Sequence, residues 1–215
     1  MQKTPRKKKC KAPDCQNWFY PQSTWHKACS TNCALEVARA DERRKKKKEL
    51  RKAKERLKTR SDWLRDAQTA FNAYIRQRDV DDYCISCDLP PTERPNTWDC
   101  GHYRTVGACP ELRFEPLNAH KQCKSCNSGV RRNRTRITVA LDPERHETIK
   151  SRYREKLIEK IGLERVEWLE GPHEPKRYRI EDLKEIRAEY RRKLRNLKAR
   201  QPASEPLASR IPLTD

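Results

Sequence analysis

The sequence has no long hydrophobic run and is poor in apolar residues altogether. Only 34% of its 215 residues are hydrophobic, whereas 38% are charged. A membrane-spanning helix needs roughly 20 consecutive apolar residues, and we expect none here. A chain of this composition buries little apolar surface, so its folded parts should be small and should need staples beyond a hydrophobic core.

We also expect no secretory signal, because the basic residues 1–9 are followed by no apolar stretch. We therefore expect a protein of the reducing cytoplasm, where paired cysteines favour metal ions over disulfides.

Negative charge is scarce, since the chain has 31 Asp and Glu but 51 Lys and Arg, for a formal net charge of +20. This balance predicts a nucleic-acid partner. A membrane surface is the weaker candidate, because the basic segments lack a strong aromatic face.

Ten cysteines are present, and eight of them fall into two quartets. In the middle of the chain, two Cys-x2-Cys pairs are separated by 35 residues. Four thiolates at this spacing predict one tetrahedral zinc site that is closed to chemistry and instead fixes the fold. Its binding is worth on the order of 10 kcal/mol or more. The predicted ligands are Cys84, Cys87, Cys123 and Cys126.

The second quartet predicts a smaller N-terminal zinc finger within residues 1–34, with ligands Cys10, Cys15, Cys29 and Cys33. Four aromatic residues lie between its cysteine pairs, and we expect them to form the miniature core of the finger: Trp18, Phe19, Tyr20 and Trp25. Unliganded thiols in a disordered arm are the alternative. Such an arm has little use for four aromatic residues.

Helices are predicted on both sides of the central cysteines. Residues 35–60 lack Pro and Gly and predict a basic helical arm that either contacts DNA phosphates or is a solvated linker. Ser61 is the expected N-cap of a helix at about 62–78, whose apolar face should pack on the zinc module. Residues 142–200 predict two more helices, and 201–215 a disordered tail. The last helix carries an apolar stripe that either closes the core or joins two chains in a homodimer.

Polar residues between the central cysteine pairs fit the needs of phosphodiester hydrolysis. That reaction requires a base that takes a proton from water and a hard cation that neutralises the phosphate. His102 is the candidate base, because a neutral imidazole accepts a proton near pH 7. Asn127 and Asp99 are candidate Mg²⁺ ligands. Asn118 would accept the imidazole N–H and fix its tautomer.

These residues make the sequence similar to the HNH, or ββα-metal, endonucleases. That family carries a His on its first strand, an Asn five residues before the closing Cys pair, and a His or Asn directly after that pair, as do His102, Asn118 and Asn127 here. The terminal Asn resembles the endonuclease VII branch. Residues 99–105, 112–114 and 120–123 further resemble the phage NinG/Rap recombination nucleases, and this likeness extends over roughly residues 5–200.

The resemblance implies an endonuclease that cuts branched DNA, such as Holliday junctions and D-loops, in a phage-infected bacterial cell. It implies a general base at His102, a Mg²⁺ (or Mn²⁺) ligand at Asn127 and an orienting residue at Asn118, with phage recombination proteins as further partners. Many HNH enzymes place an Asp directly before the base, where this chain has Gly101. On a regular strand Asp99 and His102 face opposite ways, so sharing one cation would require a bulge at Gly101.

We therefore expect an α+β protein with a small zinc-bound ββα-metal (HNH, treble-clef-like) core at residues 61–141, preceded by a zinc finger on a long basic helix. His120 is either a catalytic residue and second metal ligand or a residue that packs beside the zinc. Candidate DNA contacts are Arg104, Arg113, Lys121, Arg131 and Arg132. A rival hypothesis is a non-catalytic zinc-dependent nucleic-acid-binding protein, which has no need for the His102, Asn118 and Asn127 set.

Overall fold

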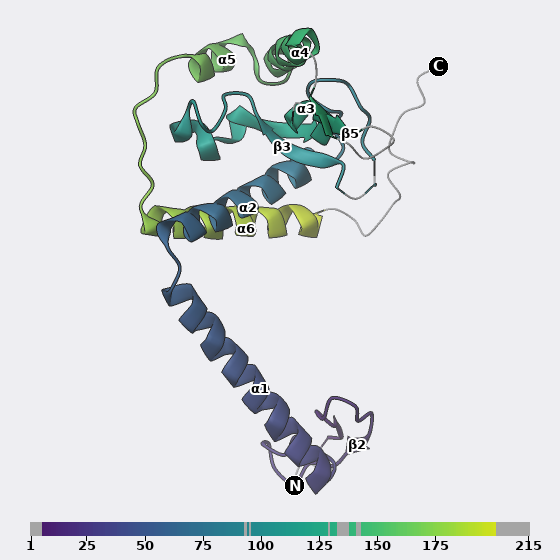
Figure 1. Cartoon of the computed structure of the whole chain (residues 1–215). Coiled ribbons are helices and arrows are strands. Elements are labelled where there is room, and N and C mark those ends of the chain that lie inside the picture. The colour runs from purple at the N-terminus through teal and green to yellow at the C-terminus, as the bar shows by residue number, and fades with distance from the viewer. Residues whose placement is uncertain are drawn as a thin grey trace, which may run out of the picture. The chain divides into compact units, whose positions relative to one another are not determined.

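The computed structural model describes residues 6–92, 94, 96–128, 130–132, 138–140 and 143–200. Within these residues the fold is α+β and mostly helical, with three two-stranded antiparallel sheets. The chain divides into two compact units, residues 1–58 and 59–215 (Figure 1). The predicted disordered tail, 201–215, lies outside the described residues. No helix of the described ranges is both long and apolar enough to cross a membrane.

The first unit contains a short hairpin and a long helix. Strand β1 (Lys8–Lys9) pairs with β2 (Trp18–Phe19), and helix α1 spans Thr31–Arg56. Its core consists of small buried residues around the cysteines, with Phe19 as the one aromatic residue packed against it. The prediction of an aromatic core is therefore wrong for Trp18, Tyr20 and Trp25, which are largely exposed.

Helix α1 has no buried residue, so it is an exposed basic helix as predicted. Leu57 is the C-cap of α1, and Thr59 is the N-cap of the next helix, α2 (Arg60–Arg78). Ser61 is not the N-cap. Thr59 accepts a hydrogen bond from the backbone of Asp62, and the Asp62 carboxylate accepts one from the backbone of Thr59. This reciprocal capping box satisfies two free N–H groups at once, which a cap at Ser61 would not do.

The second unit is built on two helices that lie side by side, α2 and α6 (Ile180–Arg200) (Figure 1). Trp63, Ala67 and Phe71 of α2 share a core with Leu183 and Tyr190 of α6. The apolar stripe of α6 thus closes the core of its own chain, which was one of the two alternatives for this helix.

Against these helices packs a hairpin of β3 (Trp98–His102) and β4 (Ala119–Cys123), followed by the short helix α3 (Lys124–Ser128). Two 3-10 turns, η1 (Pro110–Phe114) and η2 (Pro116–Asn118), connect the strands. All five residue pairs of the ladder are in register, so the bulge considered at Gly101 does not form. A Cβ at Gly101 would lie 2.9 Å from Cβ of Gln122, so an Asp at this position would require the hairpin to shift locally.

A second core joins the hairpin loops to α4 (Pro143–Ile161) and α5 (Leu163–Glu170). Helix α4 begins at Pro143 as predicted, and Gly162, with φ of +89°, ends it and starts the turn into α5. Helix α5 was not predicted. Strands β5 (Val130–Arg132) and β6 (Thr138–Ala140) form a separate hairpin after α3.

Candidate zinc centres and active-site pocket

The central cysteines converge as their spacing predicts. The sulfur atoms of Cys84, Cys87, Cys123 and Cys126 lie within 4.8 Å of one another. Two of them, Cys87 Sγ and Cys123 Sγ, are 3.7 Å apart. Zinc–sulfur bonds of about 2.3 Å in a tetrahedron place sulfurs roughly 3.8 Å apart, so this quartet fits a zinc ion. Such an ion would tie the loop at residues 84–87 to the end of β4 and the start of α3.

The N-terminal quartet has the same geometry. Cys10, Cys15, Cys29 and Cys33 also lie within 4.8 Å of one another, with Cys15 Sγ 3.6 Å and Cys33 Sγ 3.7 Å from Cys29 Sγ. Cys33 lies in the first turn of α1. The hydroxyl of Ser30, the N-cap of this helix, accepts a hydrogen bond from the backbone N–H of Cys33. A zinc ion here would join the hairpin to α1 within the first unit.

Beside the central quartet lies a pocket of about 560 Å³. The end of β3, the second half of α3 and one face of α4 line it, and His102 and Asn127 are both among its lining residues. Arg104, from the segment that follows β3, and Arg154 of α4 also line it. The structure therefore brings two residues that are 25 positions apart in the sequence to one pocket, with arginines at its wall.

His102 is held in a single tautomer. Its Nε2 lies 3.0 Å from the carbonyl oxygen of Arg113. A carbonyl only accepts hydrogen bonds, so Nε2 carries the proton and Nδ1 has the free lone pair. The ring stacks on Phe71 with 5.8 Å between centroids. Burial lowers the pKa of His102, which keeps the imidazole neutral at pH 7.

Asn118 does not contact the imidazole, contrary to the prediction that it would fix the tautomer. Its side chain is fully buried and bonds only to backbone. Oδ1 accepts from the Arg104 N–H at 2.8 Å, and Nδ2 donates to the carbonyls of Arg104 at 3.0 Å and Leu112 at 3.2 Å. Asn118 thus links the segment after His102 to turn η1, and Arg113 of the same turn holds the histidine ring.

Asp99 and Asn127 meet each other. Nδ2 of Asn127 donates to Oδ2 of Asp99 at 3.2 Å. A carboxylate only accepts, so the amide nitrogen faces Asp99 and the amide oxygen turns away from it. Asp99 is not among the residues that line the pocket, although Gln122, its cross-strand partner on the face of the hairpin opposite His102, is. Of the two predicted Mg²⁺ ligands, Asn127 alone lies at the pocket of His102.

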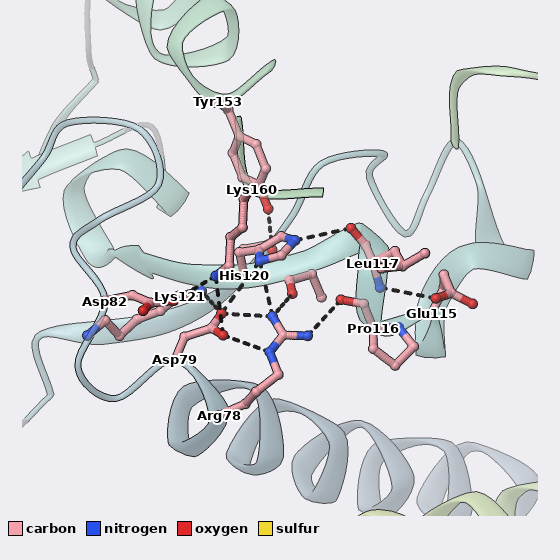
Figure 2. Close-up of polar contacts among 12 residues, drawn as sticks. Arg78, Asp79, Asp82, Glu115, Pro116, Leu117, His120, Lys121, Tyr153 and Lys160 are labelled. Atoms are coloured by element: carbon pink, nitrogen blue, oxygen red, sulfur yellow. Dashed lines mark hydrogen bonds and ion pairs between the residues drawn. The ribbon is translucent and has the colours of Figure 1, made fainter. Parts of the chain in front are cut away.

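His120 takes the packing role that was its alternative. It is 2% exposed, and both ring nitrogens have partners (Figure 2). Nε2 donates to the Leu117 carbonyl at 3.1 Å, and Nδ1 accepts from Arg78 at 3.1 Å. Burial lowers the pKa of His120, so its ring is neutral. No ring nitrogen of His120 remains for a metal or a proton transfer.

The centre of this network is Asp79, which sequence reasoning missed. Its carboxylate is 2% exposed and accepts from Arg78 Nε at 2.7 Å, Arg78 Nη2 at 2.8 Å and the Lys121 N–H at 3.1 Å, with Lys160 Nζ 3.3 Å away (Figure 2). Burial alone would raise the pKa of Asp79, but the hydrogen bonds from Arg78 outweigh it and lower the pKa. The network joins α2, β4 and α4.

The five candidate DNA contacts separate in the structure. Arg104 lines the pocket, and Arg113 donates to Gln68 at 3.2 Å. Lys121 is buried, with Nζ donating to the Val80 carbonyl at 2.7 Å and lying 4.5 Å from the centre of the Trp98 ring, so the predicted DNA contact by Lys121 is wrong. The side chains of Arg131 and Arg132, in β5, lie outside the described part of the structure.

Arg154 was missed by the sequence analysis. It sits on α4, and its Nε and Nη2 donate to the Glu170 carboxylate at 2.8 and 3.1 Å. Tyr103 donates to the same carboxylate. Because its place at the pocket depends on how α4 packs against the hairpin, no local sequence signal marks this arginine.

Comparison with known proteins gives a consistent result. The family model described as "Bacteriophage Lambda NinG protein" matches residues 2–200. Protein ninG of Escherichia phage lambda is 38% identical in an alignment that covers 92% of this chain and 97% of that protein. Protein ninG of Salmonella phage P22 is 38% identical, covering 89% of this chain and 94% of that protein. No solved structure matches the chain significantly.

Proposed function

This chain belongs to the NinG family, and from its resemblance to the HNH endonucleases we propose that it is a metal-dependent endonuclease that cuts branched DNA, such as Holliday junctions and D-loops. The observation that carries the proposal is the shared pocket of His102 and Asn127 beside the central cysteine quartet. A protein that only bound nucleic acid would not require a neutral imidazole with one free nitrogen at such a place.

The proposal treats β3, β4 and α3 as an HNH, or ββα-metal, core. In such a core the strand pair presents the base and the following helix presents a metal ligand. Here β3 ends in His102, and Asn127 directly follows the last cysteine of the quartet on α3. Zinc bound to the quartet would hold these two elements in place and would take no part in the reaction.

In the proposed reaction, Nδ1 of His102 accepts a proton from the attacking water. The Arg113 carbonyl holds the ring through Nε2 and stabilises the imidazolium that forms. Asn118 supports this arrangement through the backbone, because it pins both the segment after His102 and the turn next to Arg113. The lowered pKa of His102 keeps the ring ready to accept a proton at pH 7.

A hard divalent cation such as Mg²⁺ would neutralise the phosphate and stabilise the leaving oxygen. The donor that fits it is the amide oxygen of Asn127, because oxygen ligands suit this ion. Asp99 orients that amide by accepting a hydrogen bond from its Nδ2. We therefore propose an orienting role for Asp99 in place of direct ligation.

Two arginines at the pocket, Arg104 and Arg154, are the proposed contacts to phosphate oxygens flanking the cut. The Glu170 carboxylate fixes the guanidinium of Arg154. Arginine–phosphate contacts carry no base information, so selection would depend on the shape of the branched substrate.

The proposal is tested by incubating the zinc-loaded protein with a labelled four-way junction, a D-loop and a linear duplex library, with and without added Mg²⁺. We expect Mg²⁺-dependent nicks at the branch points. Binding without cleavage of any substrate would favour the non-catalytic binding protein. Fixed cut positions in the linear library would indicate a sequence-specific nuclease instead.

A further inference from the structure

The outer face of the N-terminal hairpin is aromatic and exposed. Trp18 is 63% exposed and Tyr20 is 61% exposed, although large aromatic side chains are usually well covered. Side chains alternate along a strand, so Phe19 of β2 packs on the core around the cysteines while Trp18 points outward. Tyr20, the residue directly after β2, is exposed like Trp18, so both rings lie outside the core around the cysteine quartet.

Two lysines share this face. Lys9 is the direct cross-strand partner of Trp18, and directly paired residues point to the same side of a sheet. Lys7 Nζ lies 5.2 Å from the centre of the Tyr20 ring. We define the outer hairpin face by these four residues: Lys7, Lys9, Trp18 and Tyr20. It presents ring surfaces flanked by cations.

The charge of the finger selects the class of partner. Residues 6–30 contain six Lys and Arg and a single acidic residue, Asp14. An apolar protein partner has no need of this excess, whereas a polyanion is attracted to it. Rings with adjacent cations match a nucleotide strand in particular, because bases stack on the rings and phosphates meet the cations. Bases paired within a duplex are already stacked and cannot use such rings.

We propose that the outer hairpin face binds unpaired nucleotides of DNA, with Trp18 and Tyr20 stacking on bases and Lys7 and Lys9 contacting the adjacent phosphates. Such nucleotides occur where strands exchange at a branch point. The inference rests on the DNA-binding part of the proposed function and is independent of cleavage. It gives the N-terminal finger a role in choosing where the protein sits on DNA.

The test uses the full-length, zinc-loaded protein without Mg²⁺ and three labelled probes. These are a single-stranded oligothymidylate, a duplex with a central gap of unpaired thymidines, and a fully paired duplex of the same length. The variants are Trp18→Leu with Tyr20→Leu, which keeps apolar area but removes the rings, and Trp18→Phe with Tyr20→Phe, which keeps the rings. Trp168→Leu, a half-exposed tryptophan of the second unit, is the matched control.

For the leucine variant we expect affinity for the single-stranded and gapped probes to fall about ten-fold or more, because stacking is lost. Its affinity for the paired duplex should change less than about two-fold. The phenylalanine variant and Trp168→Leu should bind all probes as the wild type does. Changing Lys7 and Lys9 to Gln should weaken binding and make its salt dependence shallower, since two phosphate contacts are removed.

Equal binding of all three probes by the leucine variant and the wild type would overturn the inference. So would a uniform loss on paired and unpaired probes at full zinc content. If the leucine variant loses zinc, the lysine variant carries the test, and unchanged affinity of that variant for the single-stranded and gapped probes would overturn the inference. A face that instead binds a recombination protein would leave every DNA affinity unchanged. A wild type that binds gapped DNA but cuts no substrate would refute the proposed cleavage and leave this inference standing.

Discussion

At the scale of single residues, the proposed role of His102 predicts how the proposed cleavage depends on pH. A general base acts only when deprotonated, so the rate falls as the pH drops through its pKa. Burial lowers the pKa of His102, so the acidic limb of the profile should have its midpoint below about 6.5, the ordinary histidine value. Single-turnover cleavage rates between pH 5 and 8 measure this. A midpoint above 7 would contradict the assignment.

Asn118 and Asn127 should respond differently to the same substitution. Asn118→Ala leaves buried backbone groups of Arg104 and Leu112 without partners, so it should cost about 1–3 kcal/mol of stability as well as activity. Asn127 is exposed, and Asn127→Ala should lower the cleavage rate with a change in stability below about 0.5 kcal/mol. Denaturant unfolding and cleavage rates of both variants provide the comparison. Equal losses of stability would refute the distinction.

Spacing alone identified the cysteine quartets, because metal ligands at these offsets are a strong local pattern. Spacing also proposed His102 and Asn127, which the structure places at one pocket. The partner of the imidazole could not be predicted, since it is a backbone carbonyl, that of Arg113, and any residue type supplies one. Asp79 was missed because a charge at a helix end is usually solvated, and its burial depends on strands far along the chain.

At the scale of elements, the Asp79 network should decide how firmly β4 is held between α2 and α4. Asp79→Asn removes the buried counter-charge of Arg78, whose own side chain is only 23% exposed, and should destabilise the protein by about 3–5 kcal/mol. The matched control is Asp82→Asn, which removes an exposed pair with Lys160 and should cost less than about 1 kcal/mol. Urea unfolding of both variants measures the difference. Similar small losses would show that the network is not structural.

The same carboxylate predicts sensitivity to acid. The folded pKa of Asp79 is lowered, so its contribution is fully present above the ordinary Asp pKa of about 4 and is lost as the pH falls below it. The lowered pKa values of His102 and His120 reduce the stability of the fold at a higher pH. Below about 6.5 the unfolded chain protonates these histidines while the folded chain keeps them neutral. Stability should thus fall in two stages as the pH decreases, first below about 6.5 and then below about 4.

Periodicity predicted the helices that have long apolar stripes, including α2, α4 and α6. It failed for α5, whose eight residues bury only Val166 and Leu169 and are too few to show a repeating apolar stripe. The start of α2 was predictable in principle, because Thr59 and Asp62 have the spacing of a capping box. The outward aromatics of the first hairpin could not be foreseen, since small residues and the cysteines fill the inside of the finger.

At the scale of the whole molecule, two units with separate cysteine quartets should respond separately to loss of a metal ligand. Cys15→Ser and Cys87→Ser should each reduce bound zinc from two ions per chain to one. We expect the thermal unfolding of the second unit, followed by near-ultraviolet circular dichroism, to shift strongly with Cys87→Ser and little with Cys15→Ser. An equal shift with both variants would show that the units are coupled.

The central claim is that His102 is the base of a hydrolytic pocket held by the zinc-binding quartet. The most direct measurement is the single-turnover cleavage rate of a four-way junction by wild type and His102→Ala, at saturating protein and with zinc content and junction affinity measured in parallel. We predict that the variant binds the junction as tightly as the wild type and cuts it at least about 100-fold more slowly. A variant that binds and cuts at the wild-type rate would contradict the account.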